Sequence, residues 1–267
     1  MDLQLAEKRV LITGGASNIG RGIVHGFAAE GSRIALCDYD GDQAKRVQAE
    51  AMELGAAETV VIESDLTVDG AGASAVQQVV DRWGGLDVLV NNAGWSLGEF
   101  LAKDHDHDRW RKLVDINLIA TIETTQAAVA AMRADDAEGG NVVLVSSEAA
   151  FGQIRQGVYG ATKAAAVALA RTVAREHGRH GIRSNIVCPG LVMPEGPGAV
   201  GGKSLWAGGN DDVFNPNQID YLLKDTPLGR LTLAEDIADA VLWFASDKAA
   251  RQVTGQLIAV SGGYTMP

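Results

Sequence analysis

The sequence predicts an α/β fold: a single doubly wound domain over residues 1–267, with a seven-stranded parallel sheet and helices on both faces. Short apolar runs rich in β-branched residues alternate with longer segments of helical spacing. The runs are apolar without a break, as strands covered on both faces are. Parallel neighbours need crossover connections, which the helical segments supply. No linker or repeat divides the chain, so one domain is expected.

The expected strands and helices follow from this alternation in chain order. The strands cover Val10–Thr13, Ile34–Cys37, Thr59–Ile62, Val88–Val90, Val142–Val145, Ile182–Val187 and Gln256–Val260. The helices cover Ile19–Glu30, Asp42–Leu54, Ala73–Trp83, Trp110–Met132, Tyr159–His177 and Glu235–Ala245.

The stretch from Gly190 to Thr226 is irregular and rich in glycine and proline. A loop of this length inside a compact domain is usually functional, so residues 190–226 are interpreted as a lid over the substrate. The alternative is a surface excursion that packs on itself or on another subunit.

The bulk properties favour a folded protein with small-molecule partners. The net charge of −11 disfavours attraction to nucleic acid and to anionic lipid. No apolar run reaches the ~18 residues of a membrane span, and the N-terminus has no signal-peptide pattern, so a cytoplasmic location is expected. Cys37 and Cys188 each end an apolar run, which favours burial as small hydrophobes over a disulfide or a metal site.

A glycine-rich turn directly follows the first expected strand. It reads Thr13-Gly14-Gly15-Ala16-Ser17-Asn18-Ile19-Gly20, and a helix begins within it. Such a strand-to-helix turn lets backbone N–H groups and the helix N-terminus face a pyrophosphate, as in Rossmann domains. Glycines also suit any tight turn, so the turn alone is weak evidence.

Asp38 at the end of the second strand adds weight to a dinucleotide site. A carboxylate at this place accepts hydrogen bonds from the adenine-ribose hydroxyls and repels the additional phosphate of NADP. Neither Ser17 nor Tyr39 supplies a compensating positive charge. The predicted cofactor is therefore NAD, and the alternative for Asp38 is a solvated strand end or a helix cap.

Tyr159 and Lys163 lie at i and i+4 on one helix, so they share a face. A tyrosine with a pKa near 10 exchanges protons poorly at neutral pH, and a nearby ammonium favours its phenolate. The pair predicts a proton-transfer site in which Lys163, with help from an oxidised nicotinamide, lowers the pKa of Tyr159.

With these motifs in order, the chain resembles the short-chain dehydrogenase/reductase family over essentially its whole length. The family pattern of the first turn matches Thr13, Gly14 and Gly20, while Asn18 replaces the middle glycine. Asparagine is the non-glycine residue that best tolerates a left-handed backbone, so the turn is expected to survive.

The resemblance implies further cofactor contacts. Asp65 and Leu66 resemble the segment at the adenine ring, and Asn91-Asn92-Ala93-Gly94 resembles the signature that stabilises the sheet and lines the cleft. Pro189, Gly190 and Val192 resemble the turn at the nicotinamide amide, although Met193 stands where a threonine is common. The complete candidate set for the cofactor is Gly14, Ser17, Asn18, Ile19, Asp38, Asp65, Leu66, Asn92, Ala93, Gly94, Tyr159, Lys163, Pro189, Gly190 and Val192.

The resemblance also implies the catalytic set Asn117, Ser147, Tyr159 and Lys163. Ser147 would hold the substrate oxygen beside Tyr159, and Lys163 would bind the nicotinamide ribose. The family spacing counted back from Tyr159 selects Ser146, whereas counting along the strand selects Ser147, which is preferred because loops absorb deletions more readily than strands. Asn117 matches the asparagine that kinks the fourth helix.

The expected function is hydride transfer between NAD(H) and a small secondary alcohol or ketone. The substrate is expected to be mostly apolar or cyclic, because the candidate pocket side chains are apolar. The alternatives are a 3-oxoacyl-carrier-protein reductase and a non-catalytic dinucleotide-binding regulator. Relatives pair through their C-termini, so a homotetramer is expected. The candidate pocket residues are Trp95, Phe151, Ile154, Val158, Val192 and Trp206.

One run, Asp104-His105-Asp106-His107-Asp108, suggests a metal site at first sight. Alternating residues of a polar loop rarely converge on one ion, and a helix follows directly. Helix capping and solvation are the preferred interpretation, and no metal is predicted.

Overall fold

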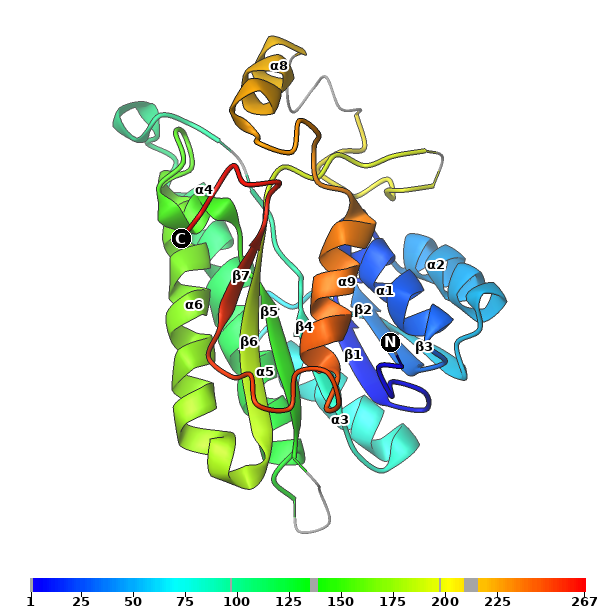
Figure 1. Cartoon of the computed structure of the whole chain (residues 1–267). Helices are drawn as coiled ribbons and strands as arrows, with labels where there is room; N and C mark the ends of the chain where they lie inside the picture. The colour runs from blue at the N-terminus through cyan, green and yellow to red at the C-terminus, as the bar shows by residue number, and fades with distance from the viewer. Residues whose placement is uncertain (1, 97, 135–138, 197, 209–215) are drawn as a thin grey trace.

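The computed structural model describes residues 2–96, 98–134, 139–196, 198–208 and 216–267. Within these residues, seven strands form one sheet in the order β3-β2-β1-β4-β5-β6-β7, and neighbouring strands are parallel (Figure 1). The predicted fold class is confirmed. The strand order reverses between β1 and β4, and ligands of open α/β sheets bind at the carboxyl ends of the strands at such a reversal.

Each predicted strand and helix overlaps an observed one. The strands are β1 (Arg9–Thr13), β2 (Arg33–Asp38), β3 (Glu58–Glu63), β4 (Val88–Asn91), β5 (Gly140–Val145), β6 (Ile182–Pro189) and β7 (Leu257–Val260). The α-helices are α1 (Ile19–Ala29), α2 (Gly41–Leu54), α3 (Ala71–Trp83), α4 (His107–Val114), α5 (Ala120–Ala131), α6 (Gly157–His177), α8 (Pro216–Asp225) and α9 (Ala234–Ala245). Shorter helical turns are η1 (Leu101–Lys103), η2 (Asp115–Ile119), η3 (Glu148–Phe151) and η4 (Gly178–His180).

The single helix predicted over 110–132 is divided in the structure. It begins earlier, because the Asp106 carboxylate accepts a hydrogen bond from the Arg109 N–H at 2.9 Å and caps α4. Between α4 and α5, η2 is a π-helical turn that carries Asn117. π-helical turns inside α-helices are frequent at functional sites.

The stretch predicted to be irregular contains a helix, so the expectation is wrong for Pro216–Asp225. Proline stands at the first position of α8, where its fixed φ suits a helix and its missing N–H costs nothing. Figure 1 shows α8 above the carboxyl end of the sheet. Residues 197 and 209–215 of the expected lid lie outside the described residues.

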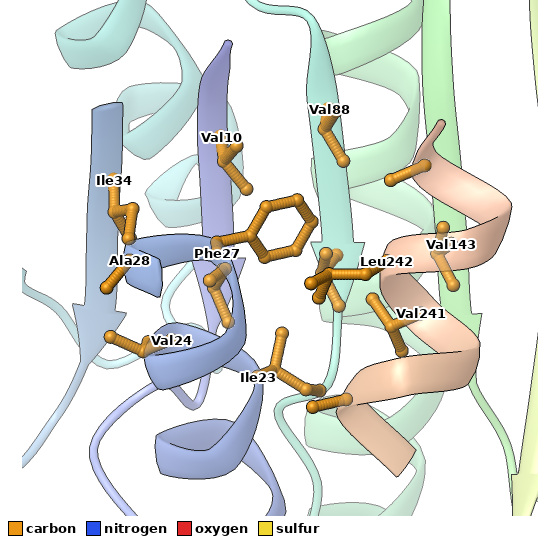
Figure 2. Packing of buried hydrophobic residues seen from close by; sticks show 14 of the residues in the cluster. Val10, Ile23, Val24, Phe27, Ala28, Ile34, Val88, Val143, Val241 and Leu242 are labelled. Carbon is orange, nitrogen blue, oxygen red and sulfur yellow. The ribbon is translucent and has the colours of Figure 1, made fainter. Parts of the chain in front are cut away.

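The core on one face of the sheet joins α1, α2 and α9 to the strands. Phe27 of α1 is fully buried, and Figure 2 shows its ring between Val10 of β1, Val88 of β4 and Leu242 of α9. Burial of such a side chain stabilises the fold by about 1.5–3 kcal/mol. The α1–α9 contact is close, since a Cβ on Gly22 would lie 2.8 Å from the Ala234 Cβ.

The opposite face is covered by α3, α5 and α6, whose buried side chains form a second cluster with the strands. Ala166 and Ala170 of α6 belong to this cluster, and Lys163 lies one turn before them. The helices packed on the two faces fix the positions of the strands, and the strands in turn fix where the loops at the carboxyl edge of the sheet begin.

Among the described residues, no helix is both long enough and apolar enough to cross a membrane.

Candidate active site

The glycine-rich turn after β1 is held by its neighbours from β4. Gly14 has a φ of +63°, and the Asn92 side-chain amide donates to the Gly14 carbonyl at 2.8 Å. A Cβ on Gly20 would collide with the Gly14 carbonyl and lie 2.8 Å from the Asn92 Nδ2. These positions therefore require glycine for close backbone approach.

Asn18 adopts a φ of +45°, in agreement with the expectation that asparagine tolerates this turn. Its backbone N–H donates to the Ala199 carbonyl at 2.8 Å, and its side-chain amide donates to the Val192 carbonyl at 3.0 Å. The residue that replaces the middle glycine thus ties the turn to the segment that follows β6. Ile19 opens α1 directly after it.

Asp38 lies at the end of β2 with 7% of its surface exposed. Its carboxylate accepts hydrogen bonds from the N–H groups of Ala16 and Asp40, each at 3.0 Å. Burial raises the pKa of Asp38, and these hydrogen bonds act in the opposite direction. The two amides fix the carboxylate beside the glycine-rich turn.

A segment far along the chain, residues 198–203, lies across the same turn and the start of α2. The Gly201 N–H donates to the Ser17 hydroxyl at 3.4 Å, and the Lys203 ammonium donates to the Tyr39 carbonyl at 2.8 Å. The sequence predicts no positive charge near Asp38. The structure corrects this, because the Lys203 ammonium lies at the backbone carbonyl of Tyr39, the residue directly after Asp38.

The 198–203 segment also packs closely on α2. The Gln43 side-chain amide donates to the Gly198 carbonyl at 2.8 Å, and the Asp40 carboxylate accepts from the Lys203 N–H at 3.2 Å. A Cβ on Gly201 would lie 2.7 Å from the Gln43 Cβ. Glycine at 201 is therefore needed for this approach.

The adenine-side candidates follow β3. Asp65 is exposed, and its carboxylate accepts from the Thr67 N–H at 3.0 Å and from the Thr67 hydroxyl at 2.7 Å, which lowers its pKa. Leu66 is buried beside it. Asp65 stands at the same edge of the sheet as Asp38, since β2 and β3 are neighbours.

The nicotinamide-side candidates follow β6. Pro189 pairs with Val260 of β7, and the Gly190 N–H donates to the Val260 carbonyl at 2.9 Å. Val192 is buried and forms an isolated bridge with Thr232. This turn therefore faces the glycine-rich turn through the Asn18–Val192 hydrogen bond.

On the catalytic side, Tyr159 of α6 is half-buried, and the Ser147 side chain lies near enough to its phenol to lower the pKa of Tyr159. Ser147 follows β5 and also accepts from the Ala149 N–H at 3.1 Å. Burial raises the pKa of Tyr159 to about 12 and outweighs the Ser147 hydrogen bond, which lowers it.

Ser146 points elsewhere. Its hydroxyl is buried and donates to the Lys163 backbone carbonyl at 2.8 Å. The two serines that the spacing left open therefore have different environments, and Ser147 is the one at the Tyr159 hydroxyl.

The Lys163 ammonium is buried and donates to the Val145 carbonyl at 2.9 Å. It lies 5.8 Å from the centroid of the Tyr159 ring, and burial lowers its pKa to about 8. The expected lowering of the Tyr159 pKa by Lys163 is not seen in the protein alone, because desolvation dominates both groups.

Asn117 is buried in the π-helical turn. Its side-chain amide pairs with the backbone of Trp95, donating to the carbonyl and accepting from the N–H, each at 2.8 Å. A Cβ on Gly94 would lie 2.8 Å from the Asn117 Oδ1 and 3.2 Å from the Lys163 Nζ. Ala93 and Gly94 thus bring the loop after β4 against both residues.

Sequence reasoning missed Glu148, which directly follows Ser147. Its Oε2 is buried and has no hydrogen-bond partner, and Thr265 near the C-terminus acts to lower the pKa of its carboxyl group. Burial raises the pKa of Glu148 to about 7. An acidic residue directly after the two serines that follow β5 was the available signal.

The expected apolar pocket is only partly present. Ile154 is 78% exposed and Phe151 is 47% exposed, whereas Val192 is buried. A small cavity beside Ser147 is lined by Glu148 and other residues, and none of the six candidate pocket side chains belongs to its wall.

The acidic run before α4 has structural roles in the described residues. The Asp104 carboxylate pairs with Arg109, Asp106 caps α4, and Asp108 pairs with Arg111 at 2.7 Å. The His107 ring stacks on Trp110 with 4.5 Å between centroids. This agrees with the capping interpretation.

The fold and the grouping of Ser147, Tyr159 and Lys163 at the carboxyl edge of the sheet define the class as an oxidoreductase of the α/β type. The family model described as "Enoyl-(Acyl carrier protein) reductase" matches residues 14–265. The chain belongs to the short-chain dehydrogenase/reductase family.

Individual relatives cover nearly the whole chain. The 3-oxoacyl-(acyl-carrier-protein) reductase FabG of Staphylococcus epidermidis is 33% identical over 261 residues, which are 97% of this chain and 99% of the relative. A 7α-hydroxysteroid dehydrogenase solved with NADH and 7-oxo glycochenodeoxycholic acid has a TM-score of 0.86 at 28% identity, with 98% and 96% of the two chains covered. An NADH-dependent reductase, A1-R', solved with NAD, has a TM-score of 0.81 at 27% identity, with 100% of both chains covered.

Proposed function

We propose that this chain is an NAD-dependent oxidoreductase that interconverts a small secondary alcohol, mostly apolar or cyclic, and its ketone. The observation that carries the proposal is the grouping of the Tyr159 phenol and the Ser147 hydroxyl, which acts on the pKa of that phenol, with the Lys163 ammonium buried behind them. A phenol and a hydroxyl that converge in this way can bind one substrate oxygen from two sides.

The residues of the cofactor half fit a dinucleotide. Gly14 and Gly20 allow the close backbone packing of the glycine-rich turn that a Cβ would prevent, and the Asp38 carboxylate is fixed beside this turn by two backbone N–H groups. The glycine turn with Ser17, Asn18 and Ile19 would hold the pyrophosphate, and Asp38 the adenosine ribose. When bound, NAD would supply hydride acceptance and NADH hydride donation.

In alcohol oxidation, the Tyr159 phenolate accepts the hydroxyl proton of the substrate while the Ser147 hydroxyl orients the substrate oxygen. In ketone reduction, the Tyr159 hydroxyl donates that proton back. The Lys163 ammonium stabilises the phenolate and binds the cofactor ribose. Asn117 holds the loop after β4 in place through Trp95, and so positions Gly94 beside Lys163.

The preference for NAD over NADP rests on Asp38, whose carboxylate lies where a ribose phosphate would meet it. It is supported by two structural relatives that were solved with NADH or NAD. Lys203 reduces this preference for NAD over NADP. Its positively charged ammonium lies at the carbonyl of Tyr39, directly after Asp38.

The second candidate is a 3-oxoacyl-carrier-protein reductase, which the name of the Staphylococcus epidermidis relative favours. The net charge of −11 gives no general attraction for an acidic carrier protein. A screen of secondary alcohols, ketones and a 3-oxoacyl thioester with both cofactors separates the two. Turnover of the thioester with NADPH alone would favour the second candidate.

Tyr159→Phe tests the proposed mechanism. We expect turnover to fall by about 1,000-fold or more, because the acid/base group is removed, while NADH binding measured by fluorescence stays within about threefold. Tyr221→Phe, at an exposed tyrosine of α8, is the matched control. Near-normal turnover in Tyr159→Phe would exclude Tyr159 from the mechanism.

A wild-type chain that binds NADH and turns over no compound of the screen would favour the non-catalytic regulator. We also propose assembly into a homotetramer, which sedimentation equilibrium measures directly.

A further inference from the structure

Glu148 occupies a place next to the reacting groups that the proposed mechanism does not use. It is the first residue of η3 and directly follows Ser147, whose side chain acts on the pKa of Tyr159. The negative charge of Glu148 also acts on Tyr159 and raises the pKa of its phenol. The carboxylate therefore lies within electrostatic range of the substrate oxygen.

One oxygen of this carboxyl group has no partner. The Glu148 Oε2 is buried without a hydrogen bond. An unsatisfied buried acceptor costs about 1–3 kcal/mol, and such groups in folded proteins call for an explanation. A partner that arrives with a ligand removes the cost.

The carboxyl group lines a small cavity at the carboxyl edge of the sheet. The cavity has a volume of about 10 Å³, which accommodates one water molecule or one hydroxyl group. Its wall brings together the turn after β6, the end of α8 and the C-terminal segment, through Leu191, Leu222, Thr226 and Tyr264.

The charged groups around this cavity leave Glu148 uncompensated. Arg230 is the cation in the wall, and its guanidinium is paired with the Asp236 carboxylate at 2.6 and 2.8 Å. Cys188, the other titratable neighbour, is buried, and its thiol pKa is raised. The other polar side chains of the wall belong to Thr226, Thr232, Ser261 and Tyr264.

We propose that Glu148 is a specificity-determining residue that accepts a hydrogen bond from a second hydroxyl group of the substrate, on the carbon next to the reacting one. The preferred substrates are then vicinal diols and the matching α-hydroxy ketones. The inference rests on the proposed function, because it takes the substrate oxygen to lie at Ser147 and Tyr159. The neighbouring hydroxyl fills the water-sized cavity and gives the Glu148 Oε2 its missing partner.

The test compares two alcohols that differ by one hydroxyl group, trans-cyclohexane-1,2-diol and cyclohexanol, with NAD. For each enzyme, the readout is the ratio of kcat/KM for the diol to kcat/KM for cyclohexanol. In Glu148→Leu we expect this ratio to fall by about 10- to 100-fold, because the buried acceptor is lost. In Glu148→Gln the loss is smaller, since the amide oxygen still accepts. Glu53→Leu, at an exposed glutamate of α2, is the control.

A second readout separates recognition from a merely structural role. Removal of the charge in Glu148→Gln lowers the pKa of Tyr159, so the rising limb of kcat/KM for alcohol oxidation moves to lower pH. Equal losses for both alcohols with an unchanged pH profile would overturn the inference. A wild-type chain that turns over neither alcohol nor the matching ketones contradicts the proposed function itself, whereas turnover with an unchanged ratio contradicts only the role of Glu148.

Discussion

The cofactor half and the catalytic half of the site are organised by different kinds of interaction. In the cofactor half, backbone groups dominate: the Asp38 carboxylate accepts two N–H groups, and the Asn92 amide holds the Gly14 carbonyl. In the catalytic half, buried ionisable side chains dominate, and the pKa values of Tyr159 and Lys163 are shifted to about 12 and about 8. The first half is preorganised for binding, and the second holds two groups whose charged forms are disfavoured by burial.

The largest expected effect on cofactor binding lies in the cofactor half. In Gly20→Ala, the added Cβ meets the Gly14 carbonyl and the Asn92 amide, so the turn has to shift. We expect the Kd for NADH to rise by about 100-fold, corresponding to the upper range of overpacking costs. Fluorescence titration measures it.

Gly178→Ala is the matched control for this change, because nothing lies within 4 Å of a Cβ at Gly178. If both variants bind NADH like the wild type, the close approach at Gly20 does not shape the cofactor site.

An intermediate effect is expected where the 198–203 segment crosses the cofactor half. Gly201→Ala places a methyl group against Asp40 and Gln43 and loosens the segment. Because the segment stands over the glycine-rich turn, we expect NADH to bind and to dissociate about 10-fold faster, with a Kd changed by less than about threefold. Stopped-flow fluorescence measures both rates.

Gly202→Ala should leave the rates unchanged, since a Cβ there meets nothing within 4 Å. Unaltered rates in Gly201→Ala would show that the cofactor does not pass this segment.

The smallest effect is a stability change in the catalytic half. The pKa of Lys163 is lowered from 10.5 to about 8 in the folded chain, so the folded state binds the proton less tightly than the unfolded state. The destabilisation is complete below about pH 8 and disappears as the pH rises toward 10.5. Lys163→Met loses the hydrogen bond to Val145 as well, so a net gain of about 1–2 kcal/mol at pH 7 is expected.

Thermal unfolding of Lys163→Met and the wild type at pH 7 and pH 9.5 checks the sign. The advantage of the variant should shrink at the higher pH. An advantage that grows with pH would mean that the lysine is charged without cost in the folded chain.

The same contrast explains what the sequence could predict. Gly14, Gly20 and Asp38 lie within one consecutive strand–helix–strand unit, β1–α1–β2, so short-range spacing revealed them. The strands were predictable because each is continuously apolar, and α6 because its pattern is strong. Asn117 and Ser147 were reached through the resemblance and their order in the chain.

The missed features depend on contacts between distant segments or on burial. Lys203 reaches Tyr39 only after the chain has folded, and nothing near Tyr39 in the sequence marks it. Glu148 is acidic in a position where most acids are solvated, and its burial comes from Thr265 and the segments over it. The α8 helix lies in a glycine-rich surrounding, and Pro216 was its one starting signal.

The π-helical turn between α4 and α5 also sets a rotational phase. One additional residue in a turn rotates everything beyond it by about 100° around the helix axis, relative to an uninterrupted α-helix. That rotation carries Thr124 onto Gly72 of α3, where a Cβ would lie 3.1 Å from the Thr124 backbone nitrogen. The widened turn at Asn117 thus also sets which side of α5 faces α3. Loss of one residue there would rotate α5 by about 100° and move Thr124 away from Gly72.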